Sequence, residues 1–418
     1  MDYISDLHIH SKYAGACSEQ LVLENLDSVA RSKGIGIIGT GDFTHPLWYK
    51  EIAGKLYEVD DSGTYALKGN KAGTRFVLTS EVAVFFQGRT NSRVKKIHNL
   101  ILAPNLEVVA QINEALGRFG NLGADGRPIL QISNSDLIES LHKIDERIAV
   151  IPSHAWTPWF GALGQMGFDS IKEAYEDQEK RVFAIETGLS SDPGMNWRVS
   201  ALDKYALVSW GDAHSLPKLG REATVISMDG GPSYDGIIYS IKEKKIRMTV
   251  EFYPEEGKYH LDGHRNCGVS MTPEEAKRYN NICPKCGKML TIGVLHRVEE
   301  LADRDDGYRP AGAAPYLHTV PLQEIIAYVT KKGAGTAYVA NLYKKLIDEF
   351  GTEFNVLLKS DLAGIAKVDE SLAKAIENVR SECVKIIPGY DGVFGIIDIL
   401  GRINAEKGHG RQKQIIDF

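Results

Sequence analysis

The stretch that decides the fold is Asp6-Leu7-His8-Ile9-His10, and a second stretch of similar composition, Gly211-Asp212-Ala213-His214, follows much later in the chain. Alternate residues of a β-strand point to the same face, so His8 and His10 can bind one metal ion together. Taken alone, two histidines at a strand end are more often structural. The interpretation as a metal site therefore depends on the rest of the sequence.

Metal-binding side chains also lie at the other predicted strands. Short β-branched runs alternate with helical stretches over roughly the first 230 residues, which predicts a parallel α/β architecture. The predicted strands include 35–39, 75–79, 98–102, 148–151, 182–185 and 206–210, and the predicted helices include 21–33 and 106–117. The polar residues at or after these strands are Asp42, His45, Glu81, His98, His154, Glu186, Asp212 and His214. The carboxyl ends of parallel strands build active sites, and this many ligands predicts two or three clustered metals.

The composition is that of a globular protein with more than one domain. The chain has 418 residues, of which 43% are hydrophobic and 25% are charged, so two or three domains are expected. No apolar run approaches the ~20 residues of a membrane span, and no secretory signal is visible. Five cysteines fit a reducing cytosol better than a disulfide framework. A cytoplasmic location without a membrane partner is the expectation.

The charge alone does not point to nucleic acid, because the formal net charge is −6. Local clusters of positive charge matter more than the sum, and two of them occur, at Arg89–Lys96 and Lys242–Arg247. Each of these clusters also suits an ordinary solvated surface.

Two similar knuckles follow the α/β region: His264-Arg265-Asn266-Cys267-Gly268 and Cys283-Pro284-Lys285-Cys286-Gly287. Paired knuckles place four ligands around one zinc ion, and the glycine after each permits a tight turn. A site with four protein ligands has no open position, so this zinc is predicted to be structural. His264 is the least certain ligand, because His260 and His296 lie nearby.

The order of these elements resembles the PHP family: H-x-H, Gly-Asp followed by histidine, an isolated glutamate, isolated histidines and a final Gly-Asp-Ala-His. The resemblance implies a distorted (β/α)7 barrel whose trinuclear centre of Zn, Mn or Mg hydrolyses phosphoesters. The ligands that it implies are His8, His10, Asp42, Glu81, His98, His154, Asp212 and His214, with His45 a weaker match because Phe43 and Thr44 intervene. A water molecule between two metals would be the nucleophile. The implied catalytic residues are Asp212, His154 and His214. Instead of binding a metal, His154 or His214 could pass a proton to the leaving oxygen.

A narrower resemblance covers nearly the whole chain. The knuckle block DGHRNCG…CPKCGK…IGVLHRVEELADR, with GTGDFTHPLW, IPSHAWTPWFG, ETGLSSDP and WGDAHSL, resembles the endonuclease Q family. It implies a DNA repair enzyme that flips a base and cuts 5′ to hypoxanthine, uracil or xanthine and at abasic sites. The expected domains are a PHP barrel (1–230), a zinc ribbon (231–305) and a helical domain (306–418).

Two other functions compete with this one. A PHP phosphatase acting on a small phosphorylated metabolite would need neither ribbon nor helical tail. The other is a nucleic-acid-binding protein whose barrel has lost its catalytic activity. Such a protein would not be expected to keep metal-binding residues at nearly every ligand position, as this sequence does.

Further residues are candidates for contacts with DNA or a protein partner. The aromatic candidates for stacking on bases are Trp48, Trp156 and Trp197, and the polar candidates for phosphates or base edges are Asn91, Arg93, Asn196 and Arg198. The segment Gln412–Phe418 has the Q-x-x-[aliphatic]-x-x-F spacing of peptides that bind sliding clamps. An ordinary carboxyl-terminal segment explains the same residues equally well.

Overall fold

A computed structural model describes residues 1–70, 73–87 and 94–402, which form two compact units. The first contains Met1–Arg31, Ile35–Glu251 and Leu301–Tyr316. The second contains Ser32–Gly34, Phe252–Glu300 and the described residues from Leu317 onward. Two of the predicted DNA contacts, Asn91 and Arg93, and the predicted clamp-binding segment lie outside the described residues.

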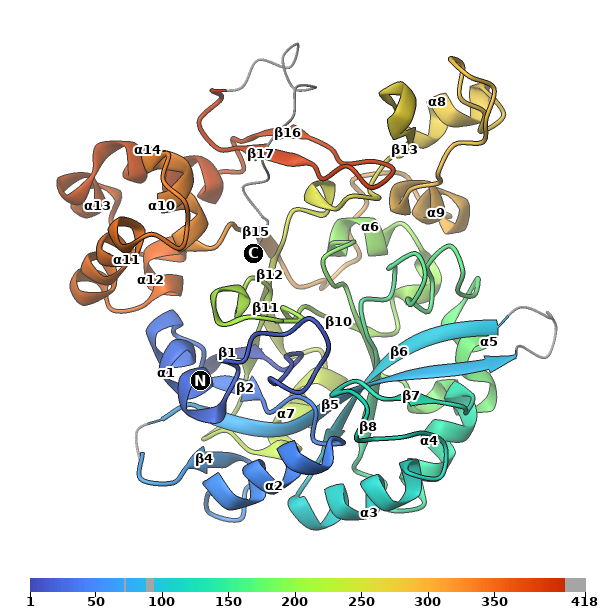
Figure 1. The fold of residues 1–418 in the computed structure, drawn as a ribbon, viewed down its shortest axis with the longest axis vertical. Coiled ribbons are helices and arrows are strands. Elements are labelled where there is room, and N and C mark those ends of the chain that lie inside the picture. Colours follow the sequence, from blue (N-terminus) through green and yellow to red (C-terminus); the bar gives the residue numbers. More distant parts are fainter. Residues whose placement is uncertain (71–72, 88–93, 403–418) are drawn as a thin grey trace. The chain divides into compact units, whose positions relative to one another are not determined.

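The first unit is built on a mixed sheet (Figure 1). Neighbouring strands follow the order β12-β11-β1-β2-β5-β4-β3, β6 and β7 also pair with β5, and β8 pairs with β6. The bounds are β1 Asp2–Asp6, β2 Ile37–Gly39, β3 Leu56–Glu58, β4 Tyr65–Leu67, β5 Arg75–Gln87, β6 Val94–Ala103, β7 Ile129–Leu130, β8 Ala149–Pro152, β11 Ala223–Ser227 and β12 Ile246–Glu251. Strands β9 (Ala184–Glu186) and β10 (Ala206–Val208) form a separate parallel pair.

The prediction of a parallel architecture is only partly right. Strands β1, β2 and β5 are parallel neighbours, as expected. Strand β11 is antiparallel to β1, however, and β6 is antiparallel to both β5 and β8. The fold is a mixed α/β fold, and the closed seven-stranded barrel stays a prediction.

Two site residues lie within strands rather than after them. Glu81 lies in the middle of β5, which was expected to end at Thr79, and His98 lies in the middle of β6. Strand β5 continues through Ser80 and Glu81 because their polar groups find hydrogen-bond partners inside the protein. The Ser80 hydroxyl, for example, forms a hydrogen bond of 2.9 Å with the Thr44 hydroxyl. The long β5–β6 ladder thus carries ligands from both strands to one place.

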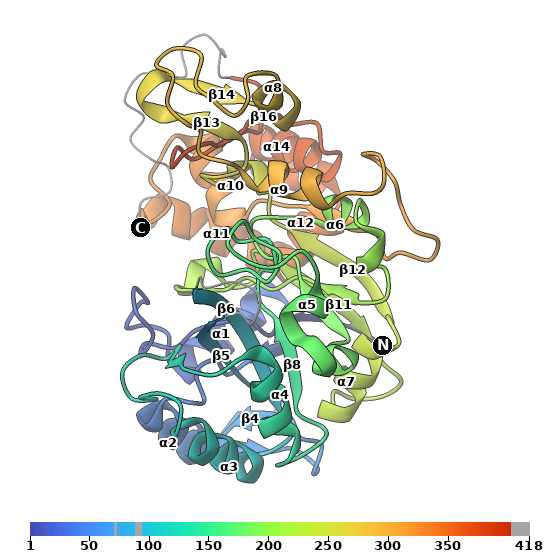
Figure 2. The same cartoon turned by 90° about the vertical axis from the view of Figure 1, so that its right-hand side faces the viewer.

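Capped helices surround the sheet (Figure 2). They are α1 Leu23–Lys33, α2 Pro46–Lys55, α3 Leu106–Leu116, α4 Asn134–His142, α5 Ile171–Tyr175, α6 Pro193–Trp197 and α7 Tyr234–Lys242. The side chains of Asn105, Ser133 and Ser233 accept hydrogen bonds from the first turns of α3, α4 and α7. These caps satisfy amide groups that a helix cannot pair within itself.

The second unit joins the knuckles to a helical bundle with its own core. The bundle consists of α10 Leu322–Thr330, α11 Ala337–Phe350, α12 Glu353–Leu358, α13 Leu362–Val368 and α14 Glu370–Arg380. Its core includes Leu322, Ile325, Leu346, Val356, Leu372 and Ile376, all fully buried. The knuckle region contributes β13 Asp262–His264, β14 Val269–Met271, α8 Pro273–Arg278 and α9 Val294–Leu301. The hairpin of β16 Lys385–Ile387 and β17 Ile396–Asp398 also belongs to this unit, and a further short strand is β15 Tyr316–His318.

None of the helices in the described part of the chain is long and apolar enough to span a membrane.

Candidate metal centre

Four side chains from distant parts of the sequence converge in the first unit. One ligand atom from each of His8, His10, Glu81 and Asp212 lies within 4.8 Å of the others. The Nε2 atom of His10 lies 3.1 Å from Asp212 Oδ1 and 3.4 Å from Glu81 Oε2. This is a compact set of nitrogen and oxygen donors aimed at one point.

The donor atoms of this cluster fit a metal ion better than they fit one another. The Nε2 atoms of His8 and His10 and Oδ1 of Asp212 are buried, and they face one another and Glu81 at 3.1–3.6 Å without hydrogen-bond geometry. A buried polar atom without a partner is costly, and native structures rarely keep several together. A divalent cation bound between them would satisfy all of these atoms at once.

A second cluster shares Glu81 with the first. Ligand atoms of Glu81, His98 and His154 also lie within 4.8 Å of one another. Both His98 Nδ1 and His154 Nε2 are 3.0 Å from Glu81 Oε1. The carboxylate of Glu81 can therefore bridge two neighbouring metal sites, and Arg127 contacts its other oxygen at 3.1 Å.

The electrostatics of the cluster favour cations. Burial alone would raise the pKa of Glu81, but His98 and His8 hold it well below its ordinary value, and His8 and His10 do the same for Asp212. Burial lowers the pKa of His98 to about 4. The neighbouring carboxylates raise the pKa of His8 and His10 well above the ordinary value of a histidine, although burial alone would lower it. A metal ion held by these two histidines would take the place of their protons, so its binding would release protons.

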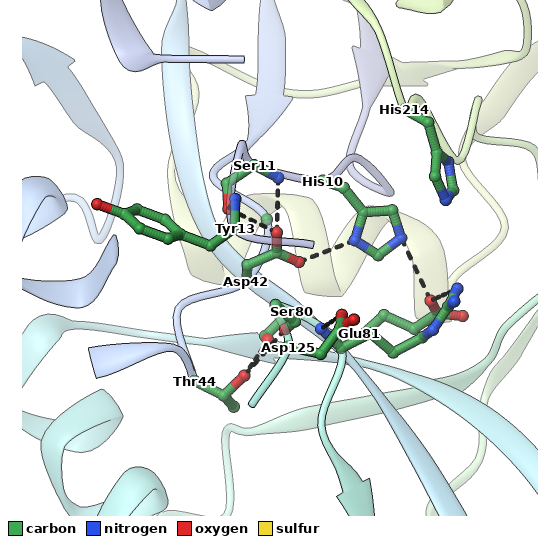
Figure 3. A network of polar contacts seen from close by, with 12 residues as sticks. His10, Ser11, Tyr13, Asp42, Thr44, Ser80, Glu81, Asp125 and His214 are labelled. Carbon is green, nitrogen blue, oxygen red and sulfur yellow. Dashed lines mark hydrogen bonds and ion pairs between the residues drawn. The ribbon is translucent and has the colours of Figure 1, made fainter. Parts of the chain in front are cut away.

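Two buried carboxylates orient the histidines of the first cluster. Figure 3 shows Asp42 between His10 and Ser11: Oδ1 accepts from His10 Nδ1 at 2.8 Å, and Oδ2 accepts from the backbone N–H of Ser11 at 2.6 Å. Glu186 accepts from His8 Nδ1 at 2.9 Å. Each carboxylate fixes the proton on Nδ1 and turns Nε2 toward the cluster, as carboxylates behind metal-bound histidines do.

Asp42 lies behind His10 in this structure, and its role as a metal ligand stays a prediction. Both of its oxygens are engaged with His10 and Ser11, and Asp42 does not belong to either described ligand cluster. Glu186 was recognised in the sequence only as a polar residue beside a strand. Arg127 has no signal in the sequence, because its loop meets Glu81 only through the tertiary fold.

His45 and His214 also lie outside the two described clusters. The His45 ring stacks on Tyr13, with 4.5 Å between centroids, at the start of α2. His214 lies beside the first cluster, its ring 4.7 Å from that of His10, and it remains partly exposed. The His214 side chain is thus more exposed than that of Asp212, whose carboxylate lies 3.5 Å from it.

Three site residues have strained backbones. Asp42, His154 and Asp212 have φ angles of +45°, +30° and +44°. Residues other than glycine rarely adopt positive φ angles. Such strain costs of order 1–3 kcal/mol for each residue and is concentrated at functional sites. The loop before Asp212 is also held by Asp6, whose carboxylate accepts from the amides of Gly211 and Gly220.

The two knuckles of the second unit bring four predicted ligands together. Ligand atoms of His264, Cys267, Cys283 and Cys286 lie within 4.8 Å of one another, as one tetrahedral ion requires. Gly268 and Gly287 have φ angles of +59° and +73°, so glycine provides the turn after each knuckle. His264 belongs to this cluster, whereas His296 binds Asp262 and is not part of it.

The expectation of exposed stacking rings is wrong for two tryptophans. Trp48 and Trp156 are fully buried. The Trp48 indole donates to the carbonyls of Thr40 and Gly41, and Trp156 donates to Asn196, which is itself buried. These residues brace the loops around the site.

Trp197 and Arg198 are partly exposed at the end of α6. The Trp197 ring packs edge-on against Tyr316, and the backbone carbonyl of Arg198 accepts from Asp303 and Arg304. Direct contacts of these two residues with DNA stay predictions.

Sequence comparison relates this chain to one family model and to two proteins of other organisms. Residues 321–383 match the family model of the MJ0043 C-terminal domain. Protein MJ0043 of Methanocaldococcus jannaschii is 35% identical over 250 residues, which are 58% of this chain and only 31% of that protein. Protein YqxK of Bacillus subtilis is 28% identical over 94% of this chain and 98% of its own length.

Two solved structures share the fold over almost the whole chain. One is the lesion-specific endonuclease PfuEndoQ from Pyrococcus furiosus, with a TM-score of 0.84 and 33% identity over 97% of this chain and 98% of that one. The other is endonuclease Q in complex with a 27-mer duplex that has an abasic lesion at the active site. Its TM-score is 0.83, with 32% identity over 97% of this chain and 100% of that one.

Proposed function

Because this chain belongs to the endonuclease Q family, we propose that it cuts DNA 5′ to deaminated bases and at abasic sites through a multinuclear metal centre. Family membership makes it a DNA endonuclease, a hydrolase of phosphodiester bonds. The proposed bases are hypoxanthine, uracil and xanthine. The proposed catalytic centre holds two or three divalent ions, which are Zn, Mn or Mg. A separate structural zinc is proposed in the knuckles.

One observation supports the metal centre above all. Several buried donor atoms of His8, His10 and Asp212 have no hydrogen-bond partner in the described structure, and they converge with Glu81. His98 and His154 would hold a neighbouring ion through the shared Glu81. When bound, such ions activate water as the nucleophile and offset charge on the phosphate.

The protein's own residues would prepare this chemistry. Asp42 and Glu186 fix the orientation of His10 and His8, so the ligands need little reorganisation. Arg127 offsets negative charge at Glu81 and remains partly exposed toward the site. His214, partly exposed beside His10, is the better placed of the two proposed histidines to hand a proton to the leaving oxygen.

Recognition of a deaminated base is proposed to follow base flipping. Deamination replaces an amine donor with a carbonyl acceptor, which backbone N–H groups or asparagine donors can detect once the base is outside the stack. The test is a gel of end-labelled duplexes that carry one hypoxanthine, uracil, xanthine or abasic site, with undamaged duplex as control. Cleavage 5′ to each lesion is expected, and equal cleavage of undamaged duplex would refute the recognition scheme.

A sliding clamp is a further proposed partner, through the segment Gln412–Phe418. A clamp would raise the local concentration of the enzyme on DNA without new contacts at the centre. Equal clamp binding by the full chain and by a chain ending at Gly410 would remove this partner.

A further inference from the structure

A compact loop, residues 155–168, is attached directly to two of the proposed metal ligands. Thr157 donates from its backbone to His154, and the carbonyl of Phe160 accepts from the backbone N–H of His98 at 3.0 Å. The Phe160 ring also stacks on the His98 ring, with 4.6 Å between centroids. The position of this loop is therefore fixed relative to the centre.

The loop is also rigid within itself. Its backbone is closed by internal hydrogen bonds, among them Leu163 to Ala155 and Met166 to Pro158. At Gly161 and Gly164 a Cβ atom would lie 2.4 Å from the Ala155 carbonyl oxygen and 2.1 Å from that of Thr157. Only glycine fits such close packing of backbone on backbone, so the loop keeps one shape.

This rigid loop exposes a large aromatic side chain. All five tryptophans lie among the described residues: Trp48, Trp156 and Trp210 are fully buried, Trp197 is half-buried, and Trp159 is 45% exposed. Met166 on the same loop is 38% exposed. Single exposed apolar residues are common on this protein, but two of them on one short loop that is bonded to the proposed ligands form a candidate surface for an intermolecular contact.

The charges around the loop favour an anionic partner. Residues 155–168 include no acidic or basic residue, so the loop itself does not repel phosphate. Lys95 lies against it: its ammonium group contacts the Gly167 carbonyl and lies 4.5 Å from the centroid of the Phe168 ring. The Phe168 ring is buried, so Lys95 contributes positive charge at the loop, while the exposed ring is that of Trp159. Positive charge and an exposed aromatic ring on one loop suit nucleic acid, which offers both phosphates and base faces.

We propose that Trp159, supported by Met166, stacks on an unpaired base of the DNA substrate next to the scissile phosphate. The inference rests on the proposed function. Trp159 directly precedes Phe160, which contacts His98, and successive phosphates of one strand are only about 3.4 Å apart along a duplex. The indole therefore lies within a few nucleotides of a phosphate held at the centre. Stacking there stabilises the opened duplex that base flipping leaves behind.

The test compares full-length Trp159→Ala and Trp159→Phe with the wild type and with a matched control, Tyr239→Ala. Tyr239 is an exposed aromatic (54%) on α7, which carries none of the site residues. Kd is measured for a duplex with one abasic site, and cleavage is measured under single-turnover conditions. Loss of one base–aromatic stack should raise Kd about 5- to 150-fold in Trp159→Ala. Trp159→Phe should lose less, and Tyr239→Ala should bind like the wild type.

Tryptophan emission gives an independent readout. Duplex binding should quench the emission of the wild type and quench that of Trp159→Phe much less, because the other indoles are covered to a greater extent. An unchanged Kd in Trp159→Ala, or equal quenching in both proteins, overturns the stacking proposal. If the wild type binds lesion duplex without cutting it, the proposed function fails, yet the Kd comparison still decides the role of Trp159.

Discussion

Carboxylates of identical chemistry play two different parts in this site. Glu81 and Asp212 belong to the converging ligand cluster, whereas Asp42 and Glu186 bind the far side of the histidine rings. Sequence cannot separate the two parts, because both kinds of residue lie at or near strand ends. The difference lies in which ring nitrogen each carboxylate meets: Asp42 and Glu186 accept from Nδ1, whereas Glu81 and Asp212 approach Nε2.

Replacing Glu186 with glutamine should weaken metal binding without removing a ligand. The amide cannot accept from His8 and from the His154 backbone as a carboxylate does, so both histidines lose their fixed orientation. Metal affinity, measured by isothermal titration of the metal-depleted protein, should fall about 10- to 100-fold. Glu139→Gln on the exposed face of α4 is the control. Wild-type affinity in Glu186→Gln would show that Glu186 does not position the ligands.

At the scale of elements, the knuckles are the best predicted part of the chain. All four expected ligands converge, because the ligand spacing within each knuckle is local and the turns need only a glycine. The β5–β6 ladder was harder to predict. Polar residues at Ser80 and Glu81 suggested a strand end, but partners from elsewhere in the fold satisfy them and the strand continues.

The aromatic residues near the site show the same limit. Trp48, Trp156 and Trp159 are alike in the sequence, and only the fold decides which of these side chains is buried. Strand alternation predicted that His8 and His10 lie together. They do share one cluster, although β1 ends at Asp6 and both histidines follow the strand. Long-range partners such as Arg127 could not be predicted, since no periodicity links them to their targets.

Removing one knuckle cysteine should loosen the zinc region and leave the phosphodiesterase chemistry in place. Cys283 is a buried residue of the second knuckle. The free energy of zinc binding contributes directly to the folding of the knuckle region. Cys283→Ser should lose one zinc equivalent by elemental analysis and exchange amide hydrogens faster over residues 252–300. Cys383→Ser changes an exposed cysteine outside the cluster and should keep both properties. Retention of zinc and slow exchange in Cys283→Ser would show that Cys283 is not a ligand of a structural zinc.

At the scale of the whole molecule, the relation to endonuclease Q structures extends over 97% of the chain. The expected family and its mixed α/β fold are confirmed by this match. The division into three domains stays a prediction, because compactness groups the knuckles and the helical bundle into one unit. The sequence separates them by composition, whereas shared contacts such as that of Leu261 with Gly389 join the knuckle region to the carboxyl-terminal hairpin.

The central claim is that the buried cluster of histidines and carboxylates is a metal centre that cuts DNA. It is tested most directly by measuring bound metal and single-turnover cleavage of an abasic duplex with wild-type protein and Asp212→Asn, each stripped of metal and then reloaded. The wild type should lose cleavage on stripping and regain it on reloading. Asp212→Asn should remain folded, bind fewer metal equivalents and cut at least a thousandfold more slowly, since removing one charge-stabilising group typically costs about 10²–10³ in rate and a lost ion costs more. Full cleavage by the stripped wild type, or by Asp212→Asn without bound metal, would contradict the account.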